Sequence, residues 1–205
     1  MDAVVIGNGE SRRAVNLNQL KNHFTLIGCN ALHRDITVDH LICCDRRMAD
    51  EATTNPNTVD TLIYVREDWH HYFRKIRKNK NIRIVPDLPY KGEHKQDQPE
   101  HWGSGGYAIL LAASLGIKNI YILGFDLYPY RNKVNNIYKG TQHYAKQEAG
   151  PVDYSYWIYQ ISKIFKYFPN TNFFIVNDTE WQIPQEWQNK NVSLKNISDF
   201  SLHYK

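Results

Sequence analysis

The chain is poor in cysteine, has no long apolar run and has no strong excess of charge of either sign. Its only cysteines are Cys29, Cys43 and Cys44, an odd number without CxxC spacing. That pattern argues against a disulfide framework or a zinc site, and it is typical of reduced thiols in a cytoplasmic protein. Since no run of about eighteen apolar residues occurs, we also expect no membrane span.

The start of the chain and its total charge restrict the class of protein further. The N-terminus has no basic start followed by an apolar segment and a cleavage site, so we expect no signal peptide and a cytoplasmic location. A formal charge of +4 suits an anionic small molecule and is too small to indicate nucleic acid. A length of 205 residues suits a single domain over 1–205 with a sizeable core, and it leaves a homo-oligomer open.

Short β-branched runs alternate with helical stretches along the chain. The runs are apolar throughout, which predicts strands covered on both faces, at 3–6, 24–28, 40–44, 61–66, 82–86, 119–123 and 173–176. Helices are predicted between them, at 17–22, 46–52, 69–77, 105–115 and 154–168. This order predicts an α/β fold with a mostly parallel central sheet and helices on both faces. In the last helix, Trp157 and Ile161 are predicted to be core residues.

Two segments interrupt the alternation. Residues 87–102 are polar and contain proline, and residues 129–153 are rich in Tyr, Asn, Lys and His. Loops of this length in a compact domain are usually functional or disordered. Because the second segment contains aromatic side chains and a histidine, we predict that it is a lid or an acceptor-binding loop.

Ligands of parallel α/β sheets bind at the carboxyl ends of the strands, where this sequence places glycine, Asn and Asp. Gly7-Asn8-Gly9 follows the first strand without forming a GxGxxG or GxxxxGK[ST] motif. It is interpreted either as a tight turn or as a backbone that approaches a phosphate. Ser104-Gly105-Gly106 opens a predicted helix, and its free amides suit either close packing or an anion.

Four segments together resemble a known family: VVIGNGESRR, LIGCNAL, LICCD and SGGYAILLAASLGIKNIYILGFDLY, in this order. They resemble the bacterial CMP-sialic-acid sialyltransferases, and the related flagellin-glycosylation (motility accessory factor) proteins share much of the pattern. The resemblance runs from Val4 to Tyr128, over half of the chain. It implies a Rossmann-like nucleotide-sugar fold and metal-independent, inverting transfer from a CMP-sugar to a hydroxyl of a glycan acceptor, without a cofactor.

The resemblance also implies the residues of the site. By resemblance, the donor-binding positions are Gly7, Asn8, Gly9, Asn30, Ser104, Gly105 and Asp126. Further candidates for binding the donor, which also follow the strands or stand at the start of the predicted helix, are Ser11, Asp45 and Gly106. Tyr128 and, from the long loop, Tyr138 are expected to hydrogen-bond the leaving phosphate, whose growing charge they would stabilise.

The sequence departs from the family at two points. The family has its catalytic base, a histidine, directly before the helix that leads to the last core strand. Here that place ends in Asp153, and the nearest histidine, His143, stands about ten positions earlier. The base is therefore His143 or Asp153, or the reaction is not sialyl transfer. In addition, Glu10 places a negative charge close to the expected phosphate.

Two other functions stay open on the same scaffold. One is a pterin or nucleotide pyrophosphokinase that needs Mg²⁺, for which Asp45 and Asp126 are candidate ligands. The other is a non-catalytic nucleotide-binding module. All of these functions require the first and sixth strands to lie side by side, so that the bends after them meet one anionic ligand.

Overall fold

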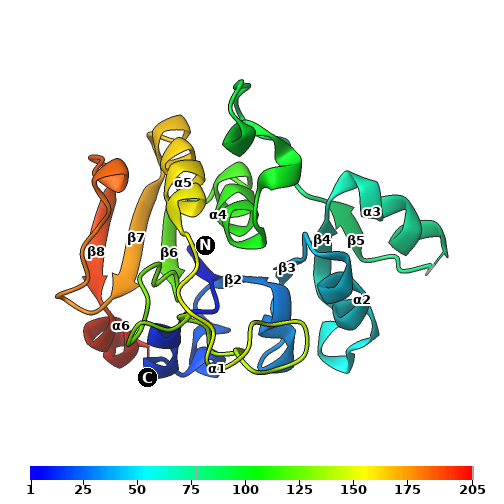
Figure 1. The fold of residues 1–205 in the computed structure, drawn as a ribbon, viewed down its shortest axis with the longest axis horizontal. Coiled ribbons are helices and arrows are strands. Elements are labelled where there is room, and N and C mark those ends of the chain that lie inside the picture. The colour runs from blue at the N-terminus through cyan, green and yellow to red at the C-terminus, as the bar shows by residue number, and fades with distance from the viewer. Residues whose placement is uncertain (77, 205) are drawn as a thin grey trace.

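The structure, a computed structural model, describes residues 1–76 and 78–204, and within this part of the chain it contains one parallel eight-stranded sheet (Figure 1). The strands are β1 (Ala3–Ile6), β2 (Thr25–Cys29), β3 (His40–Ile42), β4 (Leu62–Val65), β5 (Ile82–Ile84), β6 (Asn119–Leu123), β7 (Asn172–Asn177) and β8 (Val192–Asn196). Their order is β5-β4-β3-β2-β1-β6-β7-β8, and every neighbouring pair is parallel. The predicted Rossmann-like α/β fold is confirmed.

The central strand β1 lies between β2 and β6, in register with β6 from Ala3–Ile120 to Ile6–Leu123. All four of its residues are fully buried. Because successive side chains point to opposite faces, Val4 and Ile6 belong to the core on one face while Ala3 and Val5 belong to the core on the other. The uniformly apolar sequence of β1 follows from this double burial.

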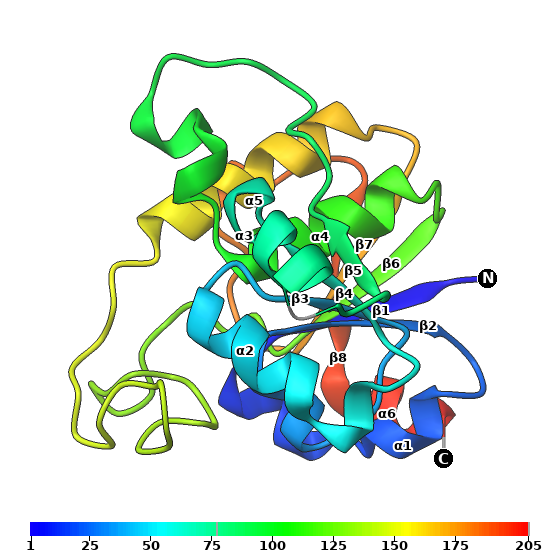
Figure 2. The same cartoon turned by 90° about the vertical axis from the view of Figure 1, so that its right-hand side faces the viewer.

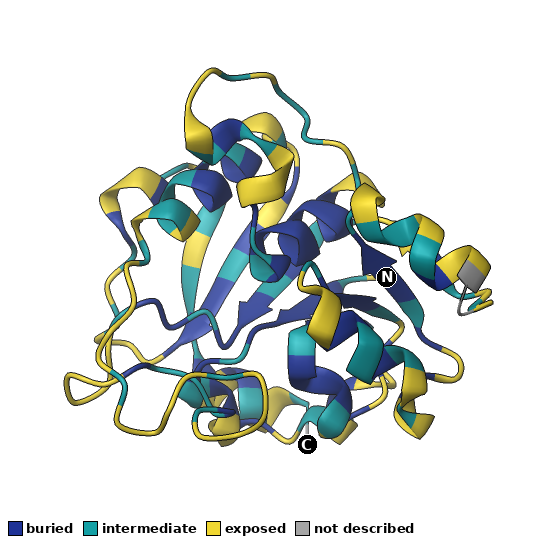
Figure 3. Cartoon of the chain, turned by 45° about the vertical axis from the view of Figure 1, so that its right-hand side comes forward, coloured by how far each residue is buried: buried dark blue, intermediate teal, exposed yellow. Residues whose placement is uncertain are grey.

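Helices cover both faces of the sheet (Figure 2). On one face lie α1 (Leu17–Leu20), α2 (Arg46–Thr54) and α6 (Ile197–His203), and on the other lie α4 (Ser104–Ser114) and α5 (Ser155–Tyr167). The central strands and α4 are buried almost throughout (Figure 3), as the apolar sequence of α4 predicts. α4 ends at Ser114 with Leu115 as its C-cap, and Gly116 follows at φ +75°, a left-handed conformation that glycine adopts without strain.

The structure differs from the sequence prediction in three elements. β8 and α6 were not predicted, because β8 (VSLKN) is an edge strand with polar, partly exposed positions. The helix expected over 69–77 is α3 (Glu67–His71) followed by a π-helical turn (Tyr72–Ile76), and Arg77 lies outside the described residues.

Among the described residues, no helix has both the length and the apolar character needed to cross a membrane.

The segment 129–153 has no helix or strand of its own, as expected, apart from an isolated bridge between Tyr130 and Lys133. It runs along the carboxyl-end edge of the sheet and returns to α5 (Figure 2). This places it beside the bends that follow β1, β2 and β6.

Candidate functional site

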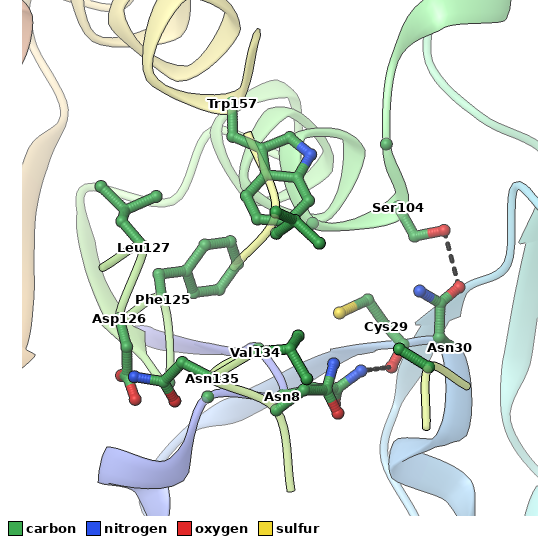
Figure 4. Close-up of a pocket in the computed structure, with 18 of the residues that line it drawn as sticks. Asn8, Cys29, Asn30, Ser104, Phe125, Asp126, Leu127, Val134, Asn135 and Trp157 are labelled. Atoms are coloured by element: carbon green, nitrogen blue, oxygen red, sulfur yellow. Dashed lines mark hydrogen bonds between the residues drawn. The ribbon is translucent and has the colours of Figure 1, made fainter. Parts of the chain in front are cut away.

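A cavity of about 350 Å³ opens at the carboxyl ends of β1, β2 and β6, below α4 and α5 (Figure 4). Its inner wall contains the bends after the three strands and the N-terminus of α4, and its outer wall comes from the segment 129–153 and α5. The lining includes these residues predicted from the sequence: Gly7, Asn8, Gly9, Asn30, Ser104, Gly105, Gly106 and Asp126. The adjacency of β1 and β6 therefore creates one shared cavity.

Two predicted binding residues lie outside this lining. Ser11 donates its amide and its hydroxyl to the two carboxylate oxygens of Asp126, the amide over 2.9 Å. Asp45 caps α2 by accepting a hydrogen bond of 2.7 Å from the amide of Arg47. Ser11 thus orients a residue of the cavity wall, whereas Asp45 stabilises a helix start.

The glycines after β1 bring the backbone of that strand close to the bend after β6. The amide of Gly7 donates to Leu123 O and that of Gly9 to Gly124 O, both over 2.8 Å. A Cβ on Gly7 would lie 2.4 Å from Gly124 O, and one on Gly9 would lie 2.5 Å from Cγ of Asp126. Close packing therefore requires glycine at both positions, and neither amide is free for a phosphate.

The next two amides of this bend are also bonded within the protein. Glu10 N donates to Oδ1 of Asn135 over 2.9 Å, and Ser11 N donates to Asp126 as described above. The bend after β1 is thus a wall of the cavity whose donors are largely used by the protein itself.

At the N-terminus of α4, in contrast to the bend after β1, the first three backbone amides are not bonded to any of the described residues. Its N-cap Gly103 is extended and supplies no side-chain cap. Within the described part of the chain, no acceptor bonds the amides of Ser104, Gly105 or Gly106, while Tyr107 N already donates to Gly103 O. Three free donors at the positive end of an eleven-residue helix, facing a cavity, suit an anionic group such as a phosphate.

A short chain of hydrogen bonds positions Asn30 next to these amides. Cys44 N donates to Ser104 Oγ over 2.9 Å, and Ser104 Oγ donates to Asn30 Oδ1 over 2.8 Å. Asn30 has φ +51°, a left-handed conformation that Asn tolerates better than most residues. The side-chain amide nitrogen of Asn30 points into the cavity (Figure 4), where it can donate to a ligand oxygen.

Asn8 lies at the floor of the cavity and is held by the long loop. Its Nδ2 donates to the hydroxyl of Tyr144 over 3.2 Å, and Ala31 N donates to the same hydroxyl over 3.3 Å. Its Oδ1 is buried without a hydrogen-bond partner among the described residues. A buried unpaired acceptor costs free energy, so this oxygen is a point at which a ligand donor would be favourable.

The structure does not bring Tyr138 to the cavity. Its hydroxyl accepts from Nη2 of the buried Arg12 over 2.6 Å and donates to Oδ2 of Asp35 over 2.6 Å. Arg12 also pairs with Asp35 over 2.8 Å. Burial raises the pKa of Tyr138, so the hydroxyl keeps its proton and anchors the loop to the body of the protein.

The remaining predicted catalytic side chains also lie outside the lining. Tyr128 donates its hydroxyl to Gln182 O over 3.0 Å. His143 is exposed at φ +67°, next to Tyr144 of the lining. Asp153 is exposed beside Val152 of the lining and accepts from Ser155 N over 2.9 Å, and hydrogen bonds from Ser155 lower the pKa of Asp153.

The charges near the cavity are largely paired. Glu10, expected to disfavour a phosphate, forms ion pairs with Lys139 over 2.8 Å and with Arg13 over 2.6 Å. Burial alone would raise the pKa of Glu10, but the hydrogen bonds from the two cations outweigh it and lower the pKa. Burial raises the pKa of Asp126 above its ordinary value, although Ser11 donates to it.

Burial disfavours the reactive form of the thiol in the cavity wall. Cys29 is buried among the lining residues, and burial raises the pKa of its thiol to about 12. The thiolate, which is the reactive form, is therefore scarce at neutral pH.

Several lining residues were not predicted from the sequence. They come from the long loop and from the residues that follow or face the strand ends: Phe125, Asn135, Asn136, Lys139, Tyr144 and Trp157. Trp157 was expected in the core but is 41% exposed, whereas Ile161 on the same helix is buried as expected. The many Asn and Tyr residues of 129–153 are the feature of the sequence that could have predicted the lining residues of the loop.

The two carboxylates proposed to bind Mg²⁺ in the pyrophosphokinase alternative occupy different places in the structure. Asp126 lines the cavity, whereas Asp45 caps α2 outside it. Within residues 1–76 and 78–204, no group of three or more His, Cys, Asp and Glu side chains could hold a metal ion. The structure therefore does not bring the two proposed ligands together in the lining of the cavity.

The fold is similar to that of a solved sialyltransferase. The X-ray structure of a mutant of the α-2,3/8-sialyltransferase CstII aligns with a TM-score of 0.55, over 85% of this chain and 81% of that chain. The two sequences are 16% identical, so the similarity concerns the fold. No protein-family model and no curated protein matches the chain.

Proposed function

We propose that the protein is a glycosyltransferase that transfers a sugar from a CMP-activated donor to a sugar hydroxyl, with inversion and without a metal ion. The observation that supports this most is the free N-terminus of α4 in a cavity between β1 and β6, within a sialyltransferase-like fold. This arrangement offers an anion site where a nucleotide phosphate can develop charge.

In this proposal, the amides of Ser104, Gly105 and Gly106 stabilise the charge that grows on the departing phosphate. Asn30 donates to the nucleotide, and Asn8 supplies a buried acceptor to it. Fixed donors and acceptors of this kind accelerate transfer by holding donor and acceptor substrates in reacting geometry. No step in this scheme requires a cation.

The catalytic base stays a prediction with two candidates, His143 and Asp153. Each lies next to a residue of the cavity lining, His143 beside Tyr144 and Asp153 beside Val152. Turnover of two variants separates them: the substitution that removes the base, His143→Ala or Asp153→Asn, should lower kcat by about a hundredfold or more, and the other should leave kcat nearly unchanged.

Ligand-dependent stability tests the donor assignment. At a hundred times its dissociation constant, CMP should stabilise the folded protein by about 2.7 kcal/mol, visible as a rise in Tm. The rise should survive a chelator. Stabilisation by ATP only in the presence of Mg²⁺, with no effect of CMP, would contradict the proposal.

A second candidate function is a nucleotide-binding module without catalysis. It is favoured by the absence of any histidine from the described lining of the cavity. CMP binding without release of CMP from a CMP-sugar in the presence of acceptors would support the module and contradict the transferase.

A further inference from the structure

The cavity has a polar interior and an apolar rim. Its inner residues include Asn8, Asn30 and Ser104, which offer hydrogen-bonding groups. The exposed residues of its lining are all apolar: Pro129, Ala145, Pro151, Val152 and Trp157. Exposed apolar groups that gather at a cavity are suited to a ligand with an apolar face, so the rim differs from the interior in the kind of ligand it favours.

Trp157 is the largest group of this rim. It lies on the first turn of α5, and its side chain lies above Phe125 at the cavity (Figure 4). The indole is 41% exposed, and its Nε1 has no hydrogen-bond partner among the described residues. A Cβ added to Gly103 would lie 3.5 Å from that nitrogen, so the indole is next to the N-terminus of α4, where the phosphate is proposed to bind.

The neighbours of Trp157 leave its ring available. By contrast, the indole nitrogens of Trp181 and Trp187 donate to backbone carbonyls of Asp126 and Ile158, as expected for tryptophans with a structural role. An exposed indole with a free N–H combines an apolar face with a polar edge. A pyranose has the matching surface, since one face presents C–H groups and its edge presents hydroxyls.

We propose that Trp157, flanked by Pro151 and Val152, is a stacking platform for the saccharide acceptor. The C–H face of a pyranose packs on the indole, and Nε1 donates to a ring hydroxyl. This inference rests on the proposed function for the position of the donor, because a nucleotide held by the inner amides leaves the rim to the other substrate.

The test uses the full chain and two neutral disaccharides, lactose and cellobiose, titrated in the presence of CMP and followed by saturation-transfer NMR. We expect Trp157→Ala to weaken disaccharide binding by about tenfold. Trp157→Phe, which keeps an aromatic face, should restore part of the loss. CMP affinity, measured separately by calorimetry, should stay unchanged in both variants.

Tyr167→Ala provides the matched control, because Tyr167 is also on α5, is 53% exposed and is not part of the cavity lining. It should change neither affinity. A Trp157→Ala variant that binds the disaccharides like the original chain would overturn the platform, as would an original chain that binds CMP and neither disaccharide. Loss of CMP affinity alone would assign Trp157 to the nucleotide and also overturn it. If the protein binds no CMP but binds the disaccharides in a way that depends on Trp157, the proposed donor is wrong and the stacking platform is supported.

Discussion

Two glycine-containing bends line the same cavity and use their backbone differently. At the bend after β1, the amides of Gly7 and Gly9 are bonded to carbonyls at the end of β6. At the start of α4, the amides of Ser104, Gly105 and Gly106 have no acceptor within the described chain. In the first bend glycine permits two backbone segments to touch, whereas in the second the helix start leaves donors open to a ligand.

This difference shows that glycines after a strand are not sufficient evidence of a phosphate site. The partners of the backbone amides are more informative, because an N–H that is already bonded within the protein is not available to a ligand. By that criterion, the N-terminus of α4 suits an anion better than the bend after β1, which forms a wall of the same cavity.

The largest effect is expected from filling the space at the bend after β1. Gly7→Ala places a methyl group 2.4 Å from Gly124 O, so the backbones of β1 and β6 must separate. We expect the free energy of unfolding to fall by about 3 kcal/mol, measured by urea denaturation. Gly150→Ala, whose Cβ meets nothing within 4 Å, is the control and should leave stability nearly unchanged.

A pair of variants at Ser104 isolates the open amide of α4. Ser104→Pro removes the amide hydrogen and the hydroxyl, while Ser104→Ala removes the hydroxyl alone. Gly103 already has the extended backbone that precedes proline, and the first helical position accepts it. We expect CMP to bind about tenfold more weakly to the Pro variant than to the Ala variant. Equal affinities, measured by calorimetry, would refute the amide site.

A smaller effect is expected from the charges beside the bend after β1. Glu10→Gln removes the anion that pairs with Lys139, so CMP should bind about threefold more tightly. Lys139→Met should weaken binding by about the same factor. Both changes should shrink as salt is added, since exposed charges are screened. Opposite signs would place the phosphate away from Lys139.

The smallest effect concerns the anchor of the long loop. Arg34 pairs with both carboxylate oxygens of Glu51, over 2.5 and 2.6 Å, and donates to Thr141 and Gln142 of the loop. The hydrogen bond from Arg34 lowers the pKa of Glu51, against a smaller opposing effect of burial.

This pair therefore stabilises the fold above pH 4.5, the ordinary pKa of the carboxyl group, and the contribution is lost as pH falls through the lower pKa of the folded state. Glu51→Gln should cost about 0.5 kcal/mol at neutral pH and less in acid. Denaturation curves across this range check the sign, and a constant difference at all pH values would contradict it.

The sequence predicted the parts of the fold that have a strong local signal. β1 and the interiors of β6 and α4 are apolar, and glycine or polar residues stand at their ends, so the type of each element could be predicted. β8 was not predicted because the sequence of an edge strand with polar positions resembles that of a loop. The predicted meeting of the bends after β1 and β6 is confirmed by their pairing.

The side-chain positions depended on distant partners. Tyr138 turns away from the cavity because Arg12 and Asp35, 126 and 103 positions away along the chain, bind its hydroxyl. The amide of Gly9 is occupied by Gly124 for the same reason. No local sequence pattern predicts contacts between residues so far apart. Trp157 was predicted to be a core residue because apolar residues recur along its helix.

The most direct test is the response of the backbone amides to CMP in a ¹⁵N–¹H correlation spectrum. We predict that saturating CMP shifts the amide protons of Ser104, Gly105 and Gly106 downfield, because hydrogen bonds to a phosphate form, while those of Gly7 and Gly9 stay close to their positions in the free protein. Large downfield shifts at Gly7 and Gly9, with the α4 amides unaffected, would contradict it.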